Sequence, residues 1–404
     1  MRSRVTRALG TVTVMAALGF VTPATVAGAA AVPAGARRTP PPTIYIAGCV
    51  DCASGKVTPF HTATNHVGKK IPVGQEPFAI AVTPDGKTVY AVNSGSDTVT
   101  PINTATNTAG PAIPVGLAPV AIAITPDGKT AYVVNYQSSS VTPIDTATNT
   151  AGRPIGVGAF PYEIAISPDG RTAYVAGRGN PGTVTPIDTA TNTPGPAITM
   201  NAFVGDIVFT PDSKTAYVAA SVANCCHAAK VIPINVVTNT AGRAIHIGAP
   251  PRHMAITPNG ATLYVTLDKA IGSVVPVSTA TNKVGKPISA GNRPTLIAIT
   301  PDGTKAYVAS QNHSDHNGLI SYHSVLTSIT IATGAVSRRI VVASGVPHLL
   351  LTMAFTPNGA TLYALGYAEA TTLPGFLVAV DTTTNKASRH FPVGLSPSSM
   401  AITP

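Results

Sequence analysis

The sequence predicts an all-β chain that folds as a β-propeller of four-stranded blades, and three observations lead to this prediction. A Thr-Pro-Asp-Gly turn or a variant of it recurs every 42 to 56 residues, starting at Thr83, Thr125, Ser167, Thr210, Thr257, Thr300 and Thr356. Beside each turn, residues alternate with the period of a strand, as in AIAI at residues 121–124. Each copy has room for four such strands, which is the pattern of a propeller blade.

The copy at residues 119–157 shows the expected elements in order. Residues 119–124 form the first strand, and the Pro-Asp-Gly at 126–128 forms a tight turn, because proline presets φ and glycine accepts a positive φ. A second strand follows at 130–134 and a third at 140–144. The polar run at 145–149 is a loop, and 153–157 is a short fourth strand. We call these the inner, second, third and outer strands of a blade.

Two of the copies resemble a known family. YAVN at residues 90–93 and YVVN at 132–135, each after TPDGKT, resemble YVTN-type β-propeller repeats, including the YncE-like secreted propellers. Other copies depart from the motif, since the one at Tyr264 reads YVTL and the one at Tyr174 reads YVAG. The resemblance covers residues 44–404 and implies the propeller fold, more often with seven blades.

Counting the copies predicts eight blades, with seven as the alternative that the resemblance suggests. One tyrosine marks each second strand: Tyr45, Tyr90, Tyr132, Tyr174, Tyr217, Tyr264, Tyr307 and Tyr363. The first copy lacks its inner strand, whereas the last copy is an inner strand alone. Residues 398–403 should therefore join the strands of residues 44–73 and close the ring, which removes an exposed sheet edge. We interpret the tyrosines as a packing column whose hydroxyls each reach a partner.

The start of the chain predicts export. Residues 1–31 have a basic start with Arg2, Arg4 and Arg7, an apolar segment at 8–21 and small residues at 27–31, as in a Sec-type signal peptide. Residues 32–43 form a proline-rich linker, and 44–404 form a single domain. We therefore expect a secreted or cell-envelope protein, monomeric and without a membrane span after cleavage. The formal charge of +10 is spread without a dense basic stripe, which argues against nucleic acid as a partner.

Four cysteines fall after second strands. In an oxidising compartment they predict two local disulfides, Cys49 with Cys52 and Cys225 with Cys226. Two alternatives remain. The four thiols could share a metal ion with His227, or Cys225 and Cys226 could be free or labile, because a disulfide between neighbouring residues is strained.

The copies differ mainly on one face of the ring. The turn between inner and second strands and the loop between third and outer strands hardly change, and chain direction places both on one face, here called the turn face. The other connections lie on the opposite face, here called the variable face, and differ in length and chemistry. Binding residues on a rigid scaffold belong on such a face.

Three adjacent inner strands carry polar residues at one repeat position, namely Glu163, Asp206 and His253. Two carboxylates and an imidazole could bind a divalent cation or act as acid and base, and the alternative is a hydrated channel rim. Four more polar or charged residues are expected close to the same mouth of the central channel, where they would suit an anionic or carbohydrate-like ligand. They are Tyr162, Arg252, Arg293 and His348. The alternative is that these loop positions simply tolerate polar residues.

A second candidate site is the longest insertion, in the seventh blade. It contains His313, Asp315, His316 and His323, which have the chemistry of metal ligands. Their spacing matches no standard zinc motif, and a solvated surface loop is the alternative that we favour.

Function is predicted less sharply than fold. The chain has no G-x-S-x-G elbow, no phosphate-binding glycine loop and no H-E-x-x-H, so no catalytic residue and no cofactor is predicted. The leading hypothesis is a secreted, non-catalytic scaffold that presents its variable face to an extracellular protein or glycan. The first alternative, which the resemblance also suggests, is a lactonase-like or other hydrolytic enzyme using Glu163, Asp206, His253 and Arg252. The second is a metal-dependent adhesion or sensing module using the loop at 313–323.

Overall fold

The computed structural model describes residues 41–49, 54–222, 225–268, 272–316, 319–345, 348–368, 374–394 and 396–404. At residues 222, 225–228, 312–316, 319–322, 344–345, 348 and 368 it describes the backbone only. These ranges contain no helix long and apolar enough to cross a membrane. The predicted signal peptide lies outside them and stays a prediction.

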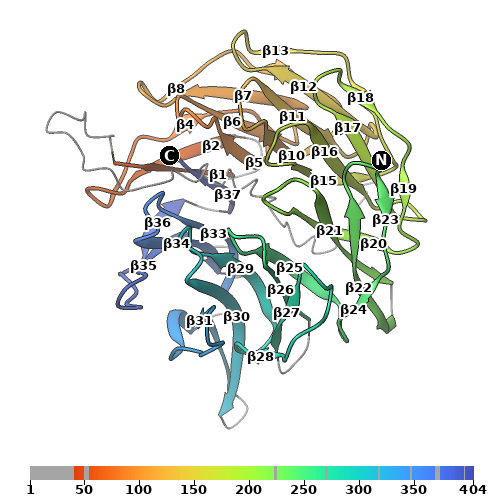
Figure 1. Ribbon diagram of the computed structural model, residues 1–404. Coiled ribbons are helices and arrows are strands. Elements are labelled where there is room, and N and C mark those ends of the chain that lie inside the picture. Colours follow the sequence, from red (N-terminus) through yellow and green to blue (C-terminus); the bar gives the residue numbers. More distant parts are fainter. Residues whose placement is uncertain are drawn as a thin grey trace, which may run out of the picture.

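The chain forms eight antiparallel sheets arranged as blades around a central axis (Figure 1). This confirms the predicted eight-bladed all-β propeller and excludes seven blades. The inner strands, in ring order from blade 1 to blade 8, are β37 (Pro397–Ile402), β5 (Pro77–Val82), β10 (Pro119–Ile124), β15 (Pro161–Ile166), β20 (Phe203–Phe209), β25 (Pro251–Ile256), β29 (Pro294–Ile299) and β33 (His348–Phe355).

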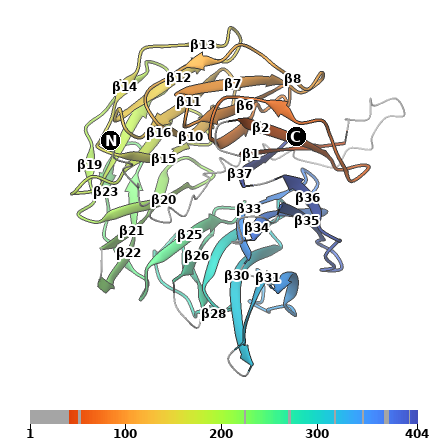
Figure 2. The ribbon, with the colours of Figure 1, turned by 180° about the vertical axis from the view of Figure 1, so that it is seen from behind.

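The second and third strands form the body of each blade. In the same order, the second strands are β1 (Thr43–Cys49), β6 (Thr88–Asn93), β11 (Thr130–Asn135), β16 (Thr172–Gly177), β21 (Thr215–Val222), β26 (Thr262–Leu267), β30 (Lys305–His316) and β34 (Thr361–Ala368). The third strands are β2 (Gly55–His61), β7 (Thr98–Asn103), β12 (Ser140–Asp145), β17 (Thr183–Asp188), β22 (Cys225–Asn235), β27 (Ser273–Ser278), β31 (Leu319–Thr330) and β35 (Gly375–Asp381). The long β30–β31 hairpin projects from the ring in both views (Figures 1 and 2).

The outer strands are short, and in blades 1 to 5 each is divided into two pieces that pair with the same third strand. They are β3 (His66–Val67), β4 (Ile71–Pro72), β8 (Thr108–Ala109), β9 (Ile113–Pro114), β13 (Thr150–Ala151), β14 (Ile155–Gly156), β18 (Thr193–Pro194), β19 (Ile198–Thr199), β23 (Thr240–Ala241), β24 (Ile245–His246), β28 (Ile288–Ser289), β32 (Ile340–Gly345) and β36 (Phe391–Gly394). The fourth strand expected at 153–157 is therefore shorter, at Ile155–Gly156, and a second two-residue piece, Thr150–Ala151, precedes it. Between the two pieces of blade 3 the register with the third strand shifts by one residue, because Ala151 lies opposite Ile144 and Ile155 lies opposite Val141.

The ring closes as predicted. The C-terminal strand β37 pairs antiparallel with β1, with Ile44 opposite Ile402 and Ile46 opposite Met400. Thr43 N–H also donates to Thr403 Oγ1 at 2.8 Å. The composite blade leaves neither end of the ring with an unpaired inner strand, and such an edge would otherwise invite pairing with another chain.

The core lies between blades. Each of the eight clusters of buried apolar residues combines side chains from two neighbouring blades, for example Tyr174 and Val184 of blade 4 with Ile207 and Phe209 of blade 5. Every blade is therefore stabilised by its two neighbours, as in other repeat architectures whose single units cannot bury their own faces.

The tyrosine column hydrogen-bonds one blade to the next. The hydroxyl of Tyr90 in blade 2 donates to Asn149 Oδ1 in blade 3, at 2.6 Å. The same bond recurs from Tyr45, Tyr132, Tyr174, Tyr217 and Tyr307 to Asn107, Asn192, Asn239, Asn282 and Asn385. Each asparagine has a positive φ, which this residue tolerates better than most. The predicted hydroxyl partner is thus the final residue of the DTATN-like loop.

The turn glycines also fit against the preceding blade. Gly128 has φ +74°, and a Cβ on it would lie 3.3 Å from Pro84 Cδ in blade 2. We expect Gly128→Ala to lower the free energy of unfolding by about 1–2 kcal/mol, because alanine pays the left-handed backbone cost at that φ. Chemical denaturation followed by circular dichroism measures this. An unchanged midpoint would show that the turn relaxes freely.

Candidate functional site

The hydrogen bonds confirm that the connections gather on two faces. On the turn face, Thr104 Oγ1 donates to the carbonyl of Gly86, which joins the loop of a blade to its own turn. On the variable face, Ser94 N–H donates to the carbonyl of Glu76 at 2.9 Å. The cluster predicted at the inner strands lies toward this second face.

Glu163, Asp206 and His253 lie on β15, β20 and β25, which are consecutive in the inner ring. Each of these strands shifts register close to its start, where the chain forms a bulge. A bulge bends the strand and re-aims its side chains. The three residues follow or occupy this irregular segment, so their side chains are directed toward the neighbouring blade.

The two carboxyl groups link successive blades. An inner strand has no sheet partner on its axial side, so its free N–H groups need other acceptors. Glu163 Oε1 accepts from Ile207 N–H of blade 5 at 3.2 Å, and Asp206 Oδ2 accepts from Met254 N–H of blade 6 at 2.5 Å. Each carboxyl group therefore binds the backbone just after the next polar residue of the row.

His253 is the third residue of the row Glu163, Asp206 and His253, but the three side chains do not form a metal site. Nδ1 of His253 lies 3.8 Å from Asp206 Oδ2, which is too long for a hydrogen bond, and makes no hydrogen bond with any described residue. Within the part of the chain whose side chains are described, no group of three or more His, Cys, Asp or Glu residues could hold a metal ion. The arrangement resembles a chain of neighbours, not a set of ligands around one point.

Burial sets the chemistry of Glu163. The side chains of Glu163 and Asp206 belong to residues only 3% and 6% exposed, and Glu163 Oε2 makes no hydrogen bond with any described group. Burial first, and the Asp206 charge second, raise the pKa of Glu163 well above its usual value. The Ile207 N–H and Arg178 oppose the shift. The pair thus favours a neutral Glu163 beside Asp206.

The other predicted ligand residues do not converge on one pocket. Tyr162 is buried and its ring stacks under the Arg178 guanidinium, 3.5 Å from the ring centroid. Arg252 forms an ion pair with Asp268, with Nη2 and Oδ2 2.7 Å apart. Arg293 is exposed in the loop before β29, and His348, described by its backbone only, begins β33. Sequence reasoning missed Arg178 and Asp268, although each follows the second strand beside the inner strand it contacts.

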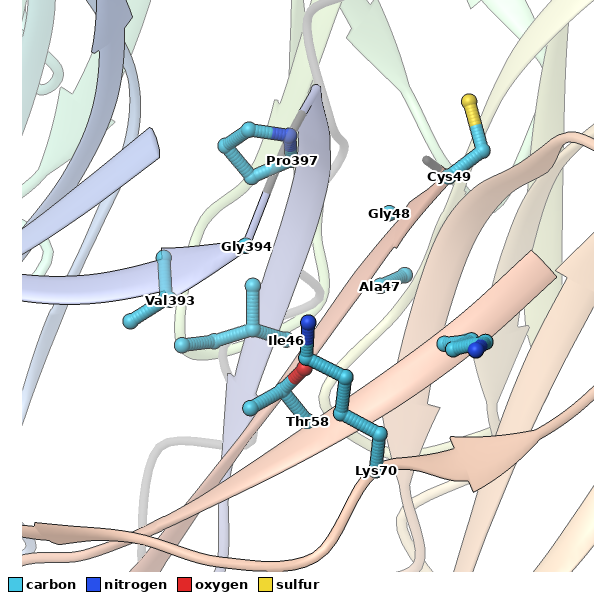
Figure 3. A pocket seen from close by; sticks show the side chains of 10 residues that line it. Ile46, Ala47, Gly48, Cys49, Thr58, Lys70, Val393, Gly394 and Pro397 are labelled. Carbon is cyan, nitrogen blue, oxygen red and sulfur yellow. The ribbon is translucent and has the colours of Figure 1, made fainter. Parts of the chain in front are cut away.

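A small pocket lies elsewhere, at the seam between blades 8 and 1. Its lining includes Ile46, Cys49, Thr58, Lys70, Val393 and Pro397. Figure 3 shows the Lys70 side chain reaching toward Ile46. Of the predicted ligand and metal residues, Cys49 alone is in its lining. We consider the buried side chains of Glu163 and Asp206 the better candidate for chemistry, because the pocket is small and its lining contains no carboxyl group and no histidine.

The cysteine pairs stay predictions. Cys49 ends β1 and is half-buried, and Cys52 lies outside the described residues. Cys225 and Cys226 begin β22, where only the backbone is described.

The predicted metal loop is not a loop but the end of the β30–β31 hairpin. Residue 313 lies opposite 322, residue 315 opposite 320, and residue 316 opposite 319, while 323 lies opposite 312. Because positions alternate between the two faces of a ladder, His313 and Asp315 belong to one face and His316 and His323 to the other. The register therefore divides the four proposed ligands into two pairs.

Comparison with known proteins places the fold. No curated protein matches the chain. Kuenenia stuttgartiensis hydrazine synthase has a similar structure, with 23% identity and a TM-score of 0.56 over 79% of this chain and 96% of that one. The dihydro-heme d1 dehydrogenase NirN, in complex with DHE, matches with 16% identity and a TM-score of 0.71 over 90% of this chain and 76% of that one. At these identities the likeness concerns the fold alone.

One family model matches part of the chain. The matched residues, 87–189, run from the first turn of blade 2 through the third strand of blade 4, which includes both copies that most resemble the YVTN motif. Residues 87–189 of this eight-bladed propeller therefore match the YNCE-like β-propeller family.

Proposed function

We propose that this chain is an exported, non-catalytic binding protein that presents its variable face to a protein or glycan outside the cell or at the cell envelope. The basic and apolar N-terminal segment supports export. The variable face supports binding, because its backbone is built the same way in most blades while its side chains differ.

One observation carries this proposal. At the apex of the loop before the inner strand, six blades have a residue other than glycine with φ between 43° and 52°, namely Glu76, Ala118, Phe160, Asn201, Arg293 and Ser396. The carbonyls of Glu76, Ala118 and Phe160 each accept a backbone N–H from the next loop, at 2.9 to 3.0 Å. A fixed apex that displays acidic, apolar, aromatic or basic side chains is a scaffold suited to recognition.

The test maps where a ligand binds. The purified chain is screened by thermal melting against cell-wall glycans, divalent metals and a displayed peptide library, and hits are mapped by backbone hydrogen exchange. A ligand at a hundredfold excess over its Kd should add about 2.7 kcal/mol of stability. We expect protection at the apex loops of the variable face. Protection confined to the turn face would overturn the proposal.

A hydrolytic activity is the second candidate, and the raised pKa of Glu163 favours it. An acid that keeps its proton beside a second carboxyl group is suited to general acid catalysis. Its burial argues the other way, since a substrate would need the channel wall to open. Hydrolysis of model lactones by the wild type, lost in Glu163→Gln while the variant keeps the circular dichroism spectrum of the folded protein, would establish the enzyme. No turnover across a panel of lactones and glycosides would remove this candidate.

A further inference from the structure

Three consecutive blades each expose a large apolar side chain at or just before the start of the inner strand, on the variable face. Leu117, Phe160 and Phe203 are 53%, 50% and 46% exposed. Leu117 and Phe160 lie in the connections that lead into β10 and β15, and Phe203 is the first residue of β20. Tyr136 of blade 3 packs against Phe160, with ring centroids 5.4 Å apart. We call Leu117, Tyr136, Phe160 and Phe203 the apolar ridge. The ridge spans blades 3 to 5 on the variable face, the face toward which Glu163 also lies.

The fold does not require apolar residues here. The apex positions equivalent to Phe160 are Glu76, Arg293 and Ser396 in other blades, with the same left-handed backbone. A left-handed φ of 52° is also unfavourable for a bulky residue such as Phe160. An exposed aromatic ring that costs solvation and backbone energy, at a site where polar residues fit, is better explained by contact with a partner.

The ridge is held rigidly. Arg178 N–H donates to the Phe160 carbonyl at 3.0 Å, and Gln137 N–H donates to the Leu117 carbonyl at 3.2 Å. Leu117 N–H in turn donates to Ser138 Oγ at 3.0 Å. Rigid anchors lose little conformational entropy on binding, which favours affinity.

A cation lies beside the ridge. Arg178 follows β16 and stacks on Tyr162, two residues from Phe160. Among the described residues it forms no ion pair. Two acids belong to this region: Glu163 is buried, and Asp97 already accepts the Ala118 N–H at 2.7 Å. The ridge is therefore apolar with a cationic border, which suits an apolar partner surface that carries carboxylates.

Resting on the proposed function, we propose that the apolar ridge docks a protein segment whose aromatic or aliphatic side chains are flanked by Asp or Glu. The apolar side chains would cover Leu117, Phe160 and Phe203, and the acidic groups would face Arg178.

Other occupants fit less well. The chain's own residues 1–40 lead into Thr43, which pairs with His61 at the turn-face end of β1, and they carry Arg37 and Arg38. A two-fold contact with a second copy would bring the two Arg178 side chains toward each other. A sugar needs an open aromatic face, but Tyr136 packs against the Phe160 ring.

Fluorescence anisotropy with a designed peptide pair tests the proposal. One labelled peptide alternates Phe and Leu with Glu, and its matched partner has Lys in place of Glu. We expect the acidic peptide to bind the full chain at least tenfold more tightly than the basic one. Phe160→Asn and Leu117→Ser should each weaken binding of the acidic peptide tenfold or more; asparagine is chosen at 160 because it tolerates the left-handed backbone. Arg178→Gln should reduce the ratio of the affinity for the acidic peptide to the affinity for the basic one. Val237→Ser, 82% exposed on the turn face, is the matched control and should bind like wild type.

The outcomes separate this inference from the broader proposal. Equal affinity for the two peptides, or no peptide binding, would overturn the docking of an acidic apolar segment. Peptide protection at variable-face loops outside blades 3 to 5 would overturn the ridge but leave the proposed function standing. Glycan binding lost in Phe160→Asn would assign the ridge to a sugar, and dimerisation lost in that variant would assign it to a second copy. Either result would overturn a protein segment as the occupant.

Discussion

Asn239→Ala is expected to lower the free energy of unfolding by about 2–4 kcal/mol, because it removes a hydrogen bond to a buried phenol and leaves alanine with a left-handed φ. Tyr174 is fully buried in blade 4, and its hydroxyl donates to Asn239 Oδ1 of blade 5 at 2.7 Å. Burial also raises the pKa of Tyr174, so its hydroxyl stays protonated and remains a donor without an acceptor in the variant. Denaturation followed by circular dichroism measures the change, since the chain has no tryptophan.

Matched variants separate the two contributions. Asn239→Gly keeps the φ of 52° accessible and removes only the side chain, so the difference from Asn239→Ala reports the backbone cost. Asn192→Ala should lose less, because Tyr132 has a second acceptor in the Thr189 carbonyl at 3.2 Å. If the bond matters, Tyr174→Phe combined with Asn239→Gly should cost less than the sum of the single changes. Strict additivity would show that Asn239 acts through its backbone alone.

These junctions show why the fold was predictable from sequence. Most blades repeat the turn, the tyrosine and the polar loop, so one copy predicts the others. The missing inner strand at the start and the extra one at Pro397–Ile402 could be matched by counting copies. The divided outer strand was not predictable, because two pieces of two residues each, offset by one residue in register, leave no periodic pattern. The asparagine partner of each tyrosine was visible as an unchanging loop residue, but its contact crosses a blade boundary.

The site was predictable only in outline. The repeat position placed Glu163, Asp206 and His253 on adjacent inner strands, and the structure does so. Repeat arithmetic gives neighbours but not the bulge, and the bulge directs each carboxyl group to the next backbone N–H. For the same reason Arg252 could not be assigned to Asp268, nor Tyr162 to Arg178. Long-range pairing in β30–β31 also replaced the expected loop at 313–323 by a ladder.

Glu163→Gln is expected to remove a pH dependence of stability that the wild type shows above acid pH. The pKa of Glu163 is raised in the folded protein by burial and by Asp206, whereas an unfolded glutamate titrates near about 4.3. At a pH between the pKa of Glu163 in the unfolded chain and its pKa in the folded protein, the native state holds one proton that the unfolded state has released. The free energy of unfolding should therefore fall as pH rises through this window, by about 1.4 kcal/mol per pH unit from this group. Glutamine keeps the shape of the neutral acid and does not titrate.

The measurement compares urea unfolding of wild type and Glu163→Gln at intervals from pH 4 to pH 9. Surface aspartates with lowered pKa values, such as Asp85 and Asp127, act in the opposite direction at acid pH but are common to both proteins, so the difference between the two curves isolates residue 163. The curves should coincide near pH 4 and diverge as the wild type loses stability. Asp206→Asn removes the second cause of the shift, so its divergence should end at a lower pH. Parallel curves would mean that Glu163 ionises freely. Glu163 and Asp206 would then lie in a solvated part of the channel wall and not in a dry contact between blades 4 and 5.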